Sequence, residues 1–237
     1  MTVDVLAIGA HPDDVELGVG GTLLLAAAQG ARVGVLDLTH GERASRGTRE
    51  ERDREAEAAA RLLDAAVREN AGLPDAGLAD TPEQRAKLIE IVRRLRPRVI
   101  LAPMSPDRHP DHEAAHALVR SANFFAGVAS FGGGEPYRAD HVFYYYPYYQ
   151  AGGRPTFVVD VSAQFDRKLE ALRAYRSQLY NPEYEGAQTF VSSPEFWDAI
   201  RDRAAYWGST VGARYGEPLY SDAPMRMDGL PGLEKAR

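Results

Sequence analysis

The sequence has 237 residues, of which 44% are hydrophobic and 26% are charged, so the chain is long enough to bury a substantial core. It contains no cysteine, which excludes disulfides, thiolate metal sites and cysteine nucleophiles. The formal net charge of −6 argues against a nucleic-acid binder and favours a small molecule as the partner. Any bound metal must therefore use histidine and carboxylate ligands.

The predicted elements begin with a buried strand. The apolar run at 3–9 ends at glycine and proline, as expected of a strand that is buried on both faces. A helix that stops at a glycine follows, and residues 31–39 predict a second buried strand. Residues 48–68 predict a charged helix, which begins with a capping box formed by Thr48 and Glu51.

The same alternation continues to residue 180. It comprises predicted helices at 81–97, 111–125 and 162–179 and predicted strands at 98–103, 141–146 and 156–162. We therefore expect an α/β, Rossmann-like three-layer fold with helices on both faces of a mostly parallel sheet. Residues 180–237 predict a loop-rich C-terminal segment around one helix, and we expect residues 1–237 to form a single domain.

The N-terminus carries no targeting pattern. It lacks the basic start and the small-residue cleavage site of a signal peptide, and no apolar run approaches the length of a membrane span. The lack of cysteine also fits a reducing compartment. We therefore expect a cytoplasmic protein that has neither a membrane nor a nucleic acid as its partner.

The tripeptide His-Pro-Asp occurs twice, at 11–13 and at 109–111. With 6 histidines and 15 prolines in the chain, only roughly 0.03 copies are expected by chance. Both copies follow a predicted strand and begin a predicted helix, at the carboxyl edge where α/β sheets bind ligands. The alternative is that these residues are helix caps, but capping does not require three histidines.

The spacing within the two motifs favours a metal site. His11 and Asp14 are three residues apart, as are His109 and His112, so each pair can point to one side of a first helical turn. A set of His11, Asp14 and His112 would leave an open position for water, as in catalytic zinc sites. Such a metal polarises a carbonyl and lowers the pKa of water toward about 7.

The remaining side chains of the motifs suit the hydrolysis of an amide. Asp13 would be the general base, and His109, if oriented by Asp111, would stay protonated and stabilise the developing oxyanion. Two alternatives remain: a sugar-binding or nucleotide-binding module without catalysis, and a phosphoester hydrolase. The second is disfavoured because the sequence offers no second carboxylate cluster for a two-metal site.

Several stretches resemble a known family: "AIGAHPDDVELGVGGT", "LDLTHGERASRGT", "REAEAAARLL", "PDRHPDH", "AYRSQ" and "VGARYGEPL". They are similar to the LmbE-like (PIG-L) zinc-dependent N-acetylglucosamine deacetylases. The resemblance is strongest to the branch that removes acetate from N-acetylglucosaminyl malate in bacillithiol biosynthesis. Chitobiose-like and inositol-linked conjugates are the alternative substrates.

The resemblance also implies roles for particular residues. It places one Zn²⁺ ion per chain on the set described above, the base on Asp13, and the oxyanion partner on His109 with Asp111. It makes Arg52 a candidate contact for substrate hydroxyls or a malate carboxylate, against the alternative of a solvated, ion-paired helix face. Glu42 and Arg43 are weaker candidates, and a homo-oligomer, with a hexamer as the first expectation, is implied.

The chain departs from the family pattern at one position. Where close relatives have a tyrosine that can move over the pocket, this sequence has Phe190, which cannot donate a hydrogen bond to an oxyanion. Tyr180, Tyr184 or another nearby ring are the alternatives for that role.

Overall fold

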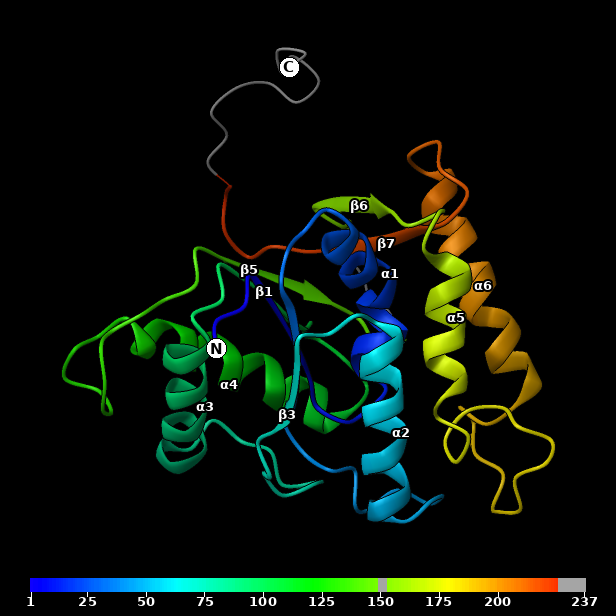
Figure 1. Ribbon diagram of the computed structural model, residues 1–237, viewed down its shortest axis with the longest axis horizontal. Coiled ribbons are helices and arrows are strands. Elements are labelled where there is room, and N and C mark those ends of the chain that lie inside the picture. Colours follow the sequence, from blue (N-terminus) through cyan, green and yellow to red (C-terminus); the bar gives the residue numbers. More distant parts are fainter. Residues whose placement is uncertain (149–152, 226–237) are drawn as a thin grey trace.

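A five-stranded parallel sheet forms the centre of the computed structural model, which describes residues 1–148 and 153–225 (Figure 1). Its order is β3-β2-β1-β4-β5. The strands are β1 (Val5–Gly9), β2 (Val33–Asp37), β3 (Val67–Asn70), β4 (Val99–Pro103) and β5 (His141–Tyr145). The parallel pairing and this order confirm the predicted Rossmann-like α/β fold.

Helices cover both faces of the sheet (Figure 1). One layer packs on each face, and a further pair of helices packs outside one of these layers. The first face carries α3 (Pro82–Leu95) and α4 (Pro110–Ala126), the second carries α1 (Asp14–Ala28) and α2 (Arg49–Leu62), and α5 (Phe165–Arg173) and α6 (Pro194–Ser209) form the outer pair.

Strand β1 shows why the central strands are continuously apolar. Leu6 and Ile8 belong to the core shared with α3 and α4, whereas Ala7 belongs to the core shared with α1. Successive side chains of a strand point to opposite faces, so a strand covered on both faces needs apolar residues at every position.

Two predicted helices are too long. The helix predicted over 48–68 ends at Leu62, and Val67–Asn70 form the edge strand β3 instead. Within that strand, Arg68 pairs with Asp37 and Glu16, two buried carboxylates distant in sequence. The helix predicted over 162–179 is confined to Phe165–Arg173.

The predicted strand at 156–162 does not join the parallel sheet. It forms β6 (Phe157–Asp160), which pairs antiparallel with β7 (Gly216–Leu219) in a separate two-stranded sheet. Tyr220 then bridges to Tyr144 and partly covers the free edge of β5. Among residues 1–148 and 153–225, no helix combines the length and apolarity that crossing a bilayer requires.

Candidate metal centre and active site

The topology brings the two His-Pro-Asp motifs together. Strands β1 and β4 are hydrogen-bonded neighbours, and each motif follows one of them at the carboxyl edge of the sheet. The chain reverses its direction of winding between these two strands, which is where open α/β sheets bind ligands. Gly9 allows the tight turn after β1, because a Cβ atom there would lie 2.9 Å from the His11 carbonyl oxygen.

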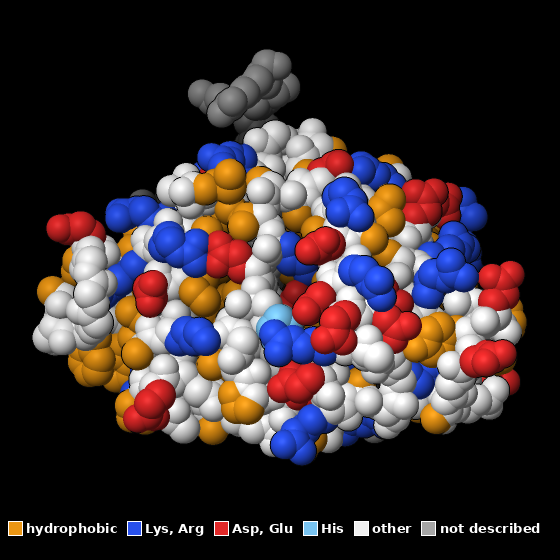
Figure 2. Space-filling model, turned by 60° about the horizontal axis from the view of Figure 1, so that its bottom comes forward, with side chains coloured by type: hydrophobic (Ala, Val, Ile, Leu, Met, Phe, Trp, Pro, Cys, Tyr) orange, Lys and Arg blue, Asp and Glu red, His pale blue; other side chains and the backbone are white. Residues whose placement is uncertain are grey.

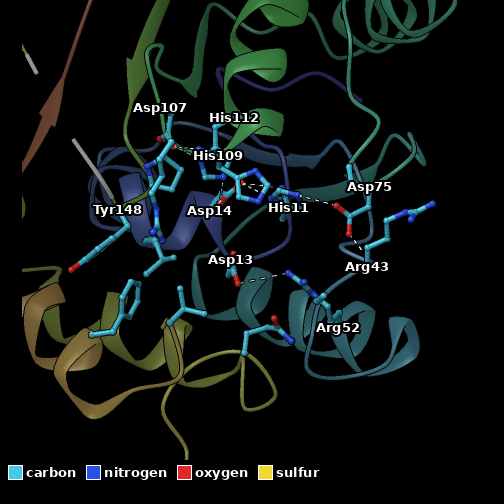
Figure 3. A pocket seen from close by; sticks show the side chains of 18 residues that line it. His11, Asp13, Asp14, Arg43, Arg52, Asp75, Asp107, His109, His112 and Tyr148 are labelled. Carbon is cyan, nitrogen blue, oxygen red and sulfur yellow. Dashed lines mark hydrogen bonds and ion pairs between the residues drawn. The ribbon is translucent and has the colours of Figure 1, made fainter. Parts of the chain in front are cut away.

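Asp14 lies between two of the predicted ligands (Figure 3). Its Oδ2 atom is 3.6 Å from His11 Nδ1, and its Oδ1 atom is 3.2 Å from His112 Nε2. The backbone N–H of His11 also donates to Asp14 Oδ2 at 2.9 Å, which fixes the carboxylate. The structure therefore brings His11, Asp14 and His112 together as the spacing of the motifs predicts.

The other nitrogen of each histidine faces a second carboxylate. His11 Nε2 lies 3.2 Å from Asp75 Oδ1 and 3.3 Å from Asp111 Oδ2. His112 Nδ1 lies 3.3 Å from Asp107 Oδ2. Histidines that bind metals commonly have their second nitrogen supported in this way.

The three histidines of the two motifs lie close enough to share a divalent metal. One ligand atom from each of His11, His109 and His112 can be chosen so that all three lie within 4.8 Å of one another, and the Asp14 carboxylate contacts His11 and His112. Zinc and other divalent metals accept imidazole nitrogens and carboxylate oxygens as ligands. The residues therefore suit a divalent metal, as the sequence predicts.

The charges of this group are strongly coupled. Burial alone would raise the pKa of Asp14, but the facing His112 and His11 outweigh it and hold this pKa well below its usual range. Burial would lower the pKa of His112, yet Asp14 and Asp107 raise it to about 9. Because metal binding requires a neutral imidazole, a cation would here take the place of protons.

Asp13 has different surroundings from its neighbour. It precedes α1 with a left-handed φ of 110° and makes no side-chain hydrogen bond to cap the helix, so the capping alternative fails for this residue. Burial raises the pKa of Asp13 to about 7, against the opposing effect of the Arg52 guanidinium. A carboxylate that titrates near neutral pH suits a general base.

Arg52 belongs to this site and not to a solvated helix face. Its side chain is 5% exposed, and its Nη2 atom lies 3.7 Å from Asp13 Oδ2. The same guanidinium donates to the carbonyls of Pro12 at 2.7 Å and Gly41 at 3.2 Å. These contacts join α2 to the turn that carries Asp13, whereas a contact of Arg52 with substrate stays a prediction.

The expected support of His109 by the Asp111 carboxylate is not found. His109 instead caps α4, with Nδ1 accepting a hydrogen bond from the backbone N–H of Asp111 at 3.2 Å. The Asp111 carboxylate faces His11 and accepts a hydrogen bond from Ala76 N. Burial, followed by His112 and His11, lowers the pKa of His109, so the neutral ring carries its proton on Nε2.

A cavity of about 310 Å³ opens onto these residues. Its polar wall includes Arg43, Asp75 and Arg108, and its apolar wall includes Tyr148 and Phe196. Asp75 and Asp107 are not among the site residues predicted from sequence. Asp75 meets His11 only through the fold, across 64 positions, whereas Asp107 stands in the stretch PDRHPDH, two residues before His109. The residues lining the cavity over the described ranges are His11, Asp13, Asp14, Leu17, Arg43, Ala44, Arg52, Asp75, Ala76, Asp107, Arg108, His109, His112, Pro147, Tyr148, Gln178, Val191 and Phe196.

Four of the remaining sequence candidates lie outside that lining: Glu42, Phe190, Tyr180 and Tyr184. Glu42 instead accepts a hydrogen bond from Asp75 N at 3.0 Å and so supports a pocket residue. Phe190 is 54% exposed and contacts the rings of Tyr148 and Phe196. Tyr148 is the tyrosine in the described lining, whereas Tyr184 contacts Glu51.

Comparison with known proteins agrees with this geometry. A family model described as PIG-L, GlcNAc-PI de-N-acetylase, matches residues 6–123, which include both motifs. Diacetylchitobiose deacetylase from Thermococcus kodakarensis is 31% identical over 91% of this chain and 81% of that protein. The chain belongs to the PIG-L family. A solved structure of a conserved protein from Thermus thermophilus is 43% identical, with a TM-score of 0.87 over 98% of this chain and 99% of that one.

The relatives that resemble this chain carry more than one named reaction. A 1D-myo-inositol 2-acetamido-2-deoxy-alpha-D-glucopyranoside deacetylase from Thermomonospora curvata is 29% identical over 97% of this chain and 98% of that protein. A 4-oxalmesaconate hydratase from Pseudomonas putida is 27% identical over 76% of this chain and 75% of that protein. The reaction of this chain must therefore be argued from its own site.

Proposed function

We propose that this PIG-L chain is a cytoplasmic, metal-dependent deacetylase that hydrolyses the acetamide of an N-acetylglucosaminyl conjugate. The observation that carries the proposal is that the carboxylates of two adjacent aspartates have different surroundings. Asp14 contacts His11 and His112, whereas Asp13 faces the cavity beside Arg52 and caps no helix. One acid is thus available to hold a metal and the other to transfer protons.

The residues divide the chemistry among themselves. His11, Asp14 and His112 would hold a zinc ion, which would supply a Lewis acid for the acetamide carbonyl and lower the pKa of water. Asp13 accepts the proton of the attacking water and returns it to the leaving amine. Neutral His109 donates its Nε2–H to the oxygen that becomes negative, which fits the hydrogen bond already accepted by its Nδ1.

The cavity supports a small acidic conjugate, with N-acetylglucosaminyl malate as the first candidate. Its volume of about 310 Å³ is at the lower end of ligand pockets, which suits a sugar joined to a small group. Arg43 and Arg108 lie in the wall, and guanidinium groups bind carboxylates through charge-assisted hydrogen bonds. A neutral second sugar or inositol would not use these charges.

Acetate release from three conjugates tests this proposal. We expect kcat/KM for N-acetylglucosaminyl malate to exceed that for the chitobiose and inositol conjugates by at least about tenfold, the effect of one charge-assisted hydrogen bond. The variant Arg43→Gln should lower the value for the malate conjugate more than for the other two. Equal or faster hydrolysis of the neutral conjugates would overturn the assignment of the malate conjugate as substrate. Release of no acetate from any of the three conjugates would overturn the proposed deacetylase activity.

A further inference from the structure

Asp107 occupies a constrained position on the loop between β4 and α4. Its side chain is 2% exposed, and its Oδ1 atom accepts a hydrogen bond from His109 N at 2.8 Å. Its own backbone N–H donates to Glu113 Oε1 at 2.9 Å. His109 N therefore fixes the Asp107 carboxylate, and Glu113 of α4 fixes the Asp107 backbone. Figure 3 shows the Asp107 side chain directed at His112.

The other carboxylate oxygen faces a ring nitrogen. Asp107 Oδ2 lies 3.3 Å from His112 Nδ1, and both atoms are buried without a hydrogen-bond partner in residues 1–148 and 153–225. Leaving two such atoms unpaired costs free energy, but this separation lets an Nδ1–H group satisfy both with a small adjustment. The opposite nitrogen of the ring, Nε2, faces Asp14 at 3.2 Å.

We propose that Asp107 is a positioning residue for the metal centre, and this inference rests on the metal site of the proposed function. By accepting a hydrogen bond from His112 Nδ1–H, the carboxylate keeps the ring proton on that nitrogen. The lone pair of Nε2 is then free and directed to the side of Asp14. Removing such outer carboxylates typically weakens metal binding by about 10-fold to 100-fold.

The variant Asp107→Asn separates this role from simple support of the loop. Asparagine keeps an oxygen that can accept from His109 N, but it puts an NH₂ group opposite His112 Nδ1, which cannot accept its proton. We expect the dissociation constant of zinc, measured by competition with a chelator and without substrate, to rise by about 10-fold to 100-fold. The midpoint of thermal unfolding of the metal-free protein should change little.

Glu113→Gln is the matched control, because it makes the same change from carboxylate to amide at the residue that accepts from Asp107 N, without changing the carboxylate that faces His112. Its zinc affinity should stay within about twofold of wild type, well below the effect of a lost outer carboxylate. Wild-type affinity in Asp107→Asn, or an equal loss in Glu113→Gln, would show that Asp107 only supports the loop.

Nitrogen-15 NMR of histidine rings in the zinc-loaded wild-type protein provides a test that needs no variant to fold. We expect His112 to carry its proton on Nδ1 and to bind zinc through Nε2, and the reverse arrangement would overturn the inference.

Failure of the proposed function gives a different result from failure of this inference. Protein that binds zinc in this way but releases no acetate refutes the deacetylase alone, whereas protein that binds no zinc refutes both.

Discussion

Adjacent aspartates in this site have unequal surroundings. Asp14 contacts two histidines, whereas Asp13 contacts one arginine and has a left-handed backbone conformation. A non-glycine residue in that region costs on the order of 1–3 kcal/mol, and such strain is concentrated at functional positions. The strained turn directs the two carboxylates differently, which is what a site with both a metal ligand and a base requires.

Replacing the predicted base tests this division. Asp13→Asn preserves the shape of the side chain but removes its ability to take a proton, so we expect kcat to fall by about 10²-fold to 10⁴-fold. Zinc content, measured by elemental analysis, should remain that of wild type. The exposed substitution Asp80→Asn is the control, and near-normal turnover by a fully loaded Asp13→Asn enzyme would exclude Asp13 as the base.

Local sequence predicted the residues within each motif better than the contacts between distant loops. The repeated His-Pro-Asp tripeptide marks His11, Asp14 and His112 because identity and spacing are properties of a short segment. Asp75 contacts His11 from 64 positions away in the sequence, and no short sequence pattern predicts this contact. For the same reason, the expectation that Asp111 orients His109 came from the motif and the family resemblance, whereas the fold turns the Asp111 carboxylate to His11.

At the scale of elements, the glycines of α1 set how closely this helix lies against the strands. A Cβ atom on Gly18 would overlap the ring of Tyr145, whose hydroxyl donates to the Ile8 carbonyl of β1. A Cβ atom on Gly20 would make ordinary contacts with Lys168 and Leu63. The first glycine therefore fixes the placement of the helix that begins with Asp14, and the second does not.

These two glycines give a matched pair of variants. Gly18→Ala should lower the free energy of unfolding by at least about 1–3 kcal/mol, because it overpacks the contact with Tyr145. Gly20→Ala should be neutral or stabilising by up to about 1 kcal/mol, because alanine favours the helix. Urea unfolding measures both, and equal effects of the two changes would contradict this packing.

Strand β3 shows why one element escaped prediction. Val67–Asn70 is short and half-buried, and its sequence, VREN, continues the charged composition of the preceding helix. What stabilises Arg68 there is a bidentate contact with Asp37 and an ion pair with Glu16, both made across the fold. Local apolar runs, by contrast, predict strands β1, β2 and β4, which is why most of the sheet was predictable.

At the scale of the whole molecule, the C-terminal region is tied to the first helix. Glu217 of β7 accepts hydrogen bonds from the backbone N–H groups of Gly21 and Thr22 and pairs with the buried Lys168 of α5. Two stretches that carry the family resemblance, at the beginning and near the end of the sequence, thus meet at the buried Glu217 carboxylate. The loop-rich segment is in this way part of the same packed structure.

Removing this acid should destabilise the whole molecule. Glu217→Ala leaves a buried lysine unpaired, so we expect the free energy of unfolding to fall by about 3–5 kcal/mol. Arg167→Ala breaks an exposed ion pair with Asp64 and should cost less than about 1 kcal/mol. Urea unfolding measures both variants. Similar losses of unfolding free energy would contradict the view that the buried ion pair contributes more to stability than the exposed one.

The predicted homo-oligomer also belongs to this scale. Light scattering of the purified protein distinguishes a single chain of 26.0 kDa from a particle of six times that mass, which is the first expectation. Large hydrophobic side chains such as Phe124 and Tyr206 are exposed in one chain and offer surfaces for such contacts. Figure 2 shows apolar side chains scattered among charges on one face of the molecule. A mass of one chain at all concentrations would exclude the oligomer.

Removal and return of the metal test most directly whether this PIG-L chain is a metal-dependent deacetylase. Chelator-treated protein should release no acetate from N-acetylglucosaminyl malate above the blank, and one equivalent of zinc per chain should restore the release of acetate and free amine in equal amounts. Undiminished hydrolysis by protein that elemental analysis shows to be metal-free, or no hydrolysis by fully loaded protein, would contradict the proposed activity.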